Sequence, residues 1–74
     1  MTKKKQKSLS EAQDKLNEAY SMLNDILSEE QDVLDNMSDY QLDSERGEEV
    51  QNTVDLLQNA CDSIEEAIDA LGDI

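Results

Sequence analysis

The stretch "DNMSDYQLDSERGEE", residues 35–49, separates two long segments in which apolar residues recur at helical spacing. It is rich in carboxylates, and Arg46 is its only basic residue. The apolar positions lose their phase between Tyr40 and Val50, and Gly47 lies in that gap. In one continuous helix this break in the apolar pattern would interrupt the packing surface, whereas in a chain reversal it falls in the turn, where no helical pattern is needed. We therefore expect a turn here, with antiparallel helices before and after it.

The segment after the turn has the clearest pattern in the chain. Its apolar residues are separated alternately by four and three positions, which is the heptad seam of a helix that packs on another helix. Ala60 and Ala67 lie one step to the side, where they allow another helix to approach closely. Gly72 is a natural stop after the last seam residue, so the pattern predicts a helix over 45–72.

The segment before the turn carries a wider apolar stripe. Ser8 with Glu11, or Ser10 with Gln13, can form the capping box that starts a helix, so we expect a helix over 8–38. Glu30 falls where the stripe predicts a leucine. The stripe has three lines, which contain Leu9, Leu16, Leu23 and Met37; Ala12, Ala19, Ile26, Val33 and Tyr40; and Tyr20, Leu27 and Leu34.

Together these patterns predict an all-α fold, a coiled-coil-like antiparallel two-helix hairpin over residues 8–74. Its turn spans 39–44, and residues 1–7 form a disordered basic tail. Two stripes this wide cannot cover each other completely, so we expect the hairpin to form a homodimer, a four-helix bundle. The predicted core and oligomer seam contains Leu16, Leu23, Ile26, Val33, Val50, Val54, Leu57, Cys61, Ile64, Ile68 and Leu71.

The size of the chain also points to a dimer. A protein of 74 residues is marginally stable alone and usually needs a disulfide, a metal or a partner chain. Cys61 is the only cysteine and histidine is absent, so an internal disulfide and a Cys/His zinc site are excluded. We interpret Cys61 as a small buried hydrophobe.

The carboxylates of the turn do not form a calcium loop. An EF-hand needs oxygen ligands at positions 1, 3 and 5, glycine at 6 and glutamate at 12. A loop that starts at Asp35 places Met37 third and Arg46 twelfth, and the other registers fail similarly. With no histidine and no expected pocket, we predict no enzyme, no metal site and no cofactor.

Charge restricts the partners of the protein. Residues 1–15 carry a net charge of +3, whereas residues 16–74 carry seventeen acids and Arg46, a net charge of −16. This field repels nucleic acid and anionic membrane, so we expect no direct binding to either. The start "MTKKKQKS" lacks the apolar core of a signal peptide, and no apolar run could span a bilayer, so we expect a cytoplasmic protein.

The acidic rows are the strongest functional signal. Acids three or four residues apart on a helix are separated by about 5–6 Å, similar to successive phosphates of a nucleic-acid strand. Ordinary helices mix both signs, because like charges at this spacing are destabilising. We expect these rows to bind a basic protein surface, and the candidate binding residues are Asp25, Glu29, Asp32, Asp35, Asp55, Asp62, Glu65, Glu66 and Asp69.

Two stretches, "EEQDVLDNMSDYQLDSERGEEVQ" and "SIEEAIDALGDI", resemble short acidic proteins encoded by phages and bacterial mobile elements. The matching residues are Glu29–Asp32, Asp35–Met37, Leu42 with Ser44–Arg46, and Ala67–Leu71. Members of this group often carry proline where this chain has Ser38. The resemblance implies a helical hairpin and a phage or prophage origin, hence a bacterial host cell, but no established activity.

The sequence as a whole predicts a non-enzymatic protein that binds another protein. Its acidic faces can imitate nucleic acid and inhibit a host nucleic-acid-binding or defence protein. One alternative is a structural or oligomerising module that takes a partner helix into an apolar groove. The other alternative is a protein that binds divalent cations weakly.

Overall fold

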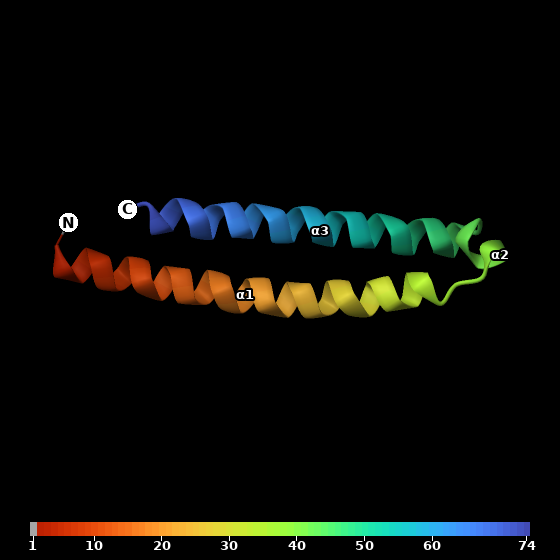
Figure 1. The fold of residues 1–74 in the computed structure, drawn as a ribbon, viewed down its shortest axis with the longest axis horizontal. Coiled ribbons are helices and arrows are strands. Elements are labelled where there is room, and N and C mark those ends of the chain that lie inside the picture. The colour runs from red at the N-terminus through yellow and green to blue at the C-terminus, as the bar shows by residue number, and fades with distance from the viewer. Residues whose placement is uncertain (1) are drawn as a thin grey trace.

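The structure is a computed structural model that describes residues 2–74, and it confirms the all-α prediction. It contains three helices: α1 (Lys3–Asp35), α2 (Asp39–Leu42) and α3 (Glu45–Gly72). In Figure 1, α1 and α3 lie side by side and run in opposite directions, with α2 at the reversal. Both ends of the chain lie at the far end of this antiparallel pair, which measures 58 × 15 × 14 Å over its Cα atoms.

The first helix begins earlier than the sequence pattern predicts. We expected a disordered tail over residues 1–7, but α1 starts at Lys3, and residue 1 lies outside the described part. The Thr2 Oγ1 atom accepts a hydrogen bond from the Lys5 backbone N–H and so satisfies one free donor of the first turn. The expected caps, Ser8 and Ser10, therefore lie inside the helix.

The turn contains a short helix that the sequence analysis missed. Asn36 ends α1, where its Nδ2 donates to the Asp32 carbonyl at 2.8 Å. Ser38 then forms a capping box with Gln41, which starts α2 inside the expected 39–44 turn. Ser44 is the N-cap of α3, and its hydroxyl oxygen accepts a hydrogen bond from the Gly47 N–H.

The contact between α1 and α3 follows one line of residues on each helix, which we call the inner line. Every residue of the inner line is buried or half-buried. Both lines alternate steps of three and four residues, so they stay in phase along the whole pair. The α1 line contains Leu9, Gln13, Leu16, Tyr20, Leu23, Leu27, Glu30, Leu34 and Met37, and the α3 line contains Gly47, Val50, Val54, Leu57, Cys61, Ile64, Ile68 and Leu71.

The most deeply buried part of this contact is a cluster of Leu27, Val50, Val54 and Cys61. Cys61 is a free thiol with only 2% of its surface exposed, as expected for a small buried hydrophobe. Glu30, which interrupts the apolar stripe of the first helix, is half-buried on the inner line.

Two predicted seam residues do not face α3. Ile26 and Val33 are 45% and 39% exposed, because Leu27 and Leu34 take the inner positions beside them. The apolar stripe of α1 is three lines wide. The pair buries the two lines that contain the leucines, and it leaves exposed the line that contains Ile26 and Val33. The two buried lines have the larger side chains, so this choice removes more apolar area from water. In the turn, Tyr40 is 87% exposed and Leu42 is 39% exposed, so neither side chain is buried against the end of the pair.

Gly47 is required where α2 meets α3. A Cβ atom at this position would lie 2.7 Å from the Leu42 Cα, 2.5 Å from its carbonyl oxygen, and also against the Gln41 carbonyl oxygen. Those atoms belong to the backbone and cannot turn aside, so only glycine lets α2 approach the first turn of α3 this closely.

Replacing Leu27 with alanine should lower the free energy of unfolding by about 2–3 kcal/mol, because the cavity lies in the centre of the inner line. Urea unfolding followed by circular dichroism, at one protein concentration, measures this loss. Tyr40→Ala is the control and should change stability by less than about 0.5 kcal/mol. Equal losses for the two variants would contradict the described core.

The two glycines provide a matched pair of alanine substitutions. Gly47→Ala should destabilise the protein by about 1–3 kcal/mol, since the new methyl group overlaps backbone atoms. Gly72→Ala meets no atom within 4 Å and should be neutral or raise stability by up to about 1 kcal/mol, because alanine favours helix. Thermal unfolding of both variants measures the difference, and a tolerant Gly47 would contradict the close approach of α2.

Candidate functional site

The antiparallel arrangement divides the remaining surface into two opposite faces. In a right-handed helix, the residue directly after an inner residue points to one side, and the residue directly before it points to the other. Compared with α1, α3 runs in the opposite direction and also faces the opposite way. These two reversals cancel, so residues that follow inner residues share one side of the pair in both helices.

The residues that follow inner residues form what we call the acidic face. Every one of them is exposed, none has a large apolar side chain, and none is basic. The α1 part contains Ser10, Asp14, Asn17, Ser21, Asn24, Ser28, Gln31 and Asp35, and the α3 part contains Glu48, Gln51, Asp55, Gln58, Asp62, Glu65, Asp69 and Gly72. Seven carboxylates are thus spread over one continuous polar surface along both helices.

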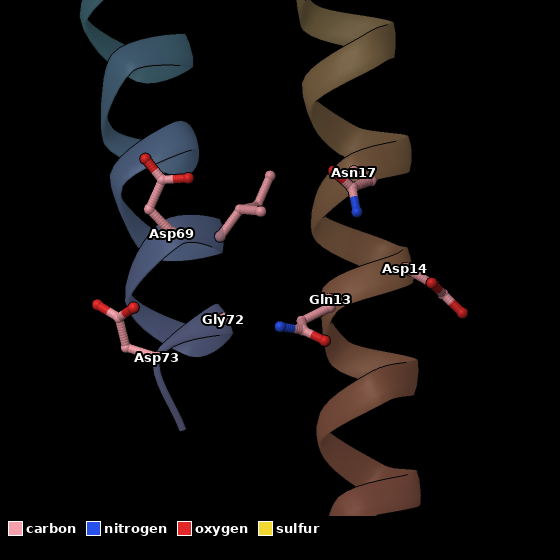
Figure 2. A pocket seen from close by; sticks show the side chains of 7 residues that line it. Gln13, Asp14, Asn17, Asp69, Gly72 and Asp73 are labelled. Carbon is pink, nitrogen blue, oxygen red and sulfur yellow. The ribbon is translucent and has the colours of Figure 1, made fainter.

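An open groove between the helices confirms that these positions share a side. It is lined by Asp14 and Asn17 of α1 and by Asp69 and Gly72 of α3. Figure 2 shows Gln13 pointing from α1 toward α3, while the Asp14 carboxylate points away from the groove. The carboxylates therefore line the surface without converging on a single point.

Amides and carboxylates of α3 are joined along this face. The Gln51 Nε2 donates to Asp55 Oδ1, and the Gln58 Nε2 donates to Asp62 Oδ1, each at 3.2 Å and across one helical turn. Such bonds between neighbouring turns hold each carboxylate in place and support the helix weakly. The glutamines therefore keep part of the carboxylate row in a defined orientation without neutralising its charge.

The structure gathers five of the nine candidate binding residues on the acidic face. Three others lie midway between inner residues and point outward from the pair: Asp25, Asp32 and Glu66. Glu29 directly precedes the inner residue Glu30 and lies on the opposite face. The five gathered residues are Asp35, Asp55, Asp62, Glu65 and Asp69.

Sequence reasoning missed two carboxylates of the acidic face, Asp14 and Glu48, and all of its amides and hydroxyls. The signal was present, because each of these residues directly follows an inner residue. For Asp14 and the other residues of α1, this signal could be used only after the inner line of α1 was known, and the three apolar lines of that segment left this open.

The opposite side of the pair, which we call the apolar face, consists of residues that directly precede inner residues. Among residues 2–74, it carries four of the seven large apolar side chains that are exposed: Met22, Ile26, Val33 and Leu56. Its charged residues are Lys15, Glu29, Arg46 and Glu49. The rest of this face contains Ser8, Ala12, Ala19, Asn36, Thr53, Ala60, Ser63, Ala67 and Ala70.

The acidic face presents exposed carboxylates that are spread along the surface. Among residues 2–74, no group of three or more Asp, Glu or Cys side chains is placed to hold a metal ion. No helix in the same part of the chain is both long and apolar enough to cross a membrane. A wide row of fixed negative charge can instead attract and orient a positively charged surface.

Comparison of the chain with protein-family models, with curated proteins and with solved structures finds no match. The class of protein is therefore defined by its geometry alone. The chain is an antiparallel helix pair with one acidic face and one apolar face.

Repulsion along the acidic face should make the protein more stable in salt. Raising sodium chloride from about 0.01 M to about 0.5 M shortens the screening length from about 30 Å to less than 5 Å. The melting temperature should rise by about 5 °C. The triple variant Asp55→Asn, Asp62→Asn, Asp69→Asn should melt higher at low salt and gain less from added salt. An unchanged salt response would contradict repulsion across this face.

Proposed function

We propose that this chain is a non-enzymatic binding protein whose acidic face docks on a basic protein surface. The observation that carries the proposal is the gathering of seven carboxylates, with no base, on one exposed face of the helix pair. Ordinary helix surfaces mix both signs, whereas here the side opposite the apolar face has a single sign. A field of one sign raises association rates and selects partners of opposite charge.

The spacing of the carboxylates favours a partner that normally holds nucleic acid. Asp55, Asp62 and Asp69 repeat every seven residues, which is about 10.5 Å along the axis. The same helix also carries Glu48 and Glu65 on this face. The neighbouring helix α1 adds Asp14 and Asp35 beside this row. This row of carboxylates along α3, with one carboxylate of α1 beside each end of it, is similar in form to the phosphates along one nucleic-acid strand, so the proposed partner is a nucleic-acid-binding or defence protein.

The active form that we propose is a homodimer with four helices. One helix pair buries only four apolar residues thoroughly, which is a small core for a protein of this size. We further propose, on the resemblance of residues 29–51 and 63–74 to acidic phage proteins, a phage origin and the cytoplasm of the bacterial host.

The test begins with the immobilised protein and a bacterial lysate at about 0.05 M sodium chloride. Captured proteins are eluted in separate experiments by duplex DNA and by about 0.5 M sodium chloride, and they are then identified and purified. Mimicry predicts basic proteins that DNA displaces and that salt releases. A captured protein that stays bound in molar salt would contradict the charge-based mechanism.

Binding of the purified partner to variants then locates the surface. The acidic-face variant Asp55→Asn, Asp62→Asn, Asp69→Asn should bind about 10-fold or more weakly. The matched control Asp25→Asn, Asp32→Asn, Glu66→Gln removes the same charge from outward positions and should lose less than about 3-fold. Equal losses would mean that only net charge matters and that the acidic face is not the docking site.

A further inference from the structure

The apolar face has no partner within one chain, although it is as long as the acidic face. Met22 and Leu56 are each 60% exposed, and Ile26 is 45% exposed. They lie on neighbouring helices on the same side of the pair, because each directly precedes an inner residue. At the end of the pair, Lys5, Ser8, Leu9 and Ile74 line one shallow depression. A large exposed apolar surface of this kind marks an interaction site.

We infer that the apolar face is where a second copy of this chain docks, so that two helix pairs stack into a four-helix bundle. The inference rests on the proposed dimer and specifies its interface. A two-fold axis brings the same face of both copies together, so the face must be complementary to itself. The alanines and small residues between the larger side chains allow close approach, while Met22, Ile26 and Leu56 fill the space between the pairs.

The charge distribution selects a second copy as the occupant. Each chain carries a net charge of −13, so two copies repel each other through most of their surfaces. The apolar face holds only Lys15, Glu29, Arg46 and Glu49 as charged residues along the paired helices, two of each sign, against seven carboxylates on the acidic face. It is the one broad side of the pair on which two such acidic chains can meet without opposing rows of carboxylates.

The area of the face is sufficient for a stable dimer. A surface 58 Å long and 15 Å wide offers a footprint of roughly 900 Å² on each copy. Stable interfaces bury about 800 Å² on each partner.

Docking through this face leaves both acidic faces on opposite outer sides of the bundle. One dimer therefore presents two binding surfaces for basic partners, and self-association does not compete with partner binding.

The inference predicts that salt acts oppositely on the two interactions. Self-association brings together two chains of like charge, so added salt should tighten the dimer. Binding of a basic partner through the acidic face should weaken under the same change. Sedimentation over a range of protein concentrations at low and high salt measures the first effect on the intact chain. A dimer that dissociates in high salt would overturn an apolar interface.

Two variants on the same helix locate the interface. Ile26→Glu places a carboxylate in the middle of the apolar face twice per dimer, and it should weaken self-association about 100-fold or more. Ser28→Glu adds the same charge to the acidic face two residues away and should leave a dimer of twice the 8.3 kDa chain mass. Circular dichroism checks that both variants stay helical, and Leu56→Glu repeats the test on α3.

Oxidation of Met22 by dilute peroxide provides a readout that needs no substitution. Met22 should become protected as the wild-type protein is concentrated, whereas the half-buried Met37 should react at a constant rate. A wild-type chain that remains at 8.3 kDa at millimolar concentration overturns both the dimer and this interface. A dimer that persists in Ile26→Glu and Leu56→Glu overturns the interface alone. Neither outcome alters the acidic face, since a monomer would still bind a basic partner.

Discussion

The seven-residue repeat shared by α1 and α3 is the constraint on which the whole structure depends. Steps of three and four residues keep one line of each helix facing the other over nearly the full 58 Å of the pair. Once those lines meet, the direction of every other side chain follows from helical geometry. The acidic and apolar faces are therefore consequences of one packing choice, which is the contact around Leu27, Val54 and Cys61.

This arrangement separates two needs that conflict in a small protein. Carboxylates must stay in water and away from one another, whereas exposed apolar residues must leave water. Because the two kinds of residue lie on opposite sides of the pair, a second copy could cover the apolar face while the carboxylates of the acidic face stay in water. The repulsion that remains along the acidic face is a cost in stability, and the binding role that we propose for that face would account for it.

The turn shows where local chemistry could and could not be read in advance. Ser44 was recognisable as a cap because a short polar side chain precedes a helical segment that is rich in glutamate. Ser38 and Gln41 form an equally good capping box, but four residues are too few to produce a periodic signal, so α2 was missed. Thr2 likewise starts α1 early through one side-chain hydrogen bond, in a segment where the concentration of lysines predicted disorder.

The sequence by itself determined the all-α class, the position of the reversal at residues 35–49 and the inner line of α3, whose single unbroken heptad seam allows only one choice. It also determined the charge imbalance, on which the proposal of a basic partner rests. Only the tertiary structure decided which of the apolar lines of α1 packs inward. Ile26 and Leu27 are equally apolar, so the spacing alone does not say which of the two side chains faces α3 and is buried. That choice makes Asp14 a member of one face and places Glu29 on the other. The physical reason is that a helix pattern shows the spacing of its residues, whereas the direction in which they point is set by the helix that packs against them.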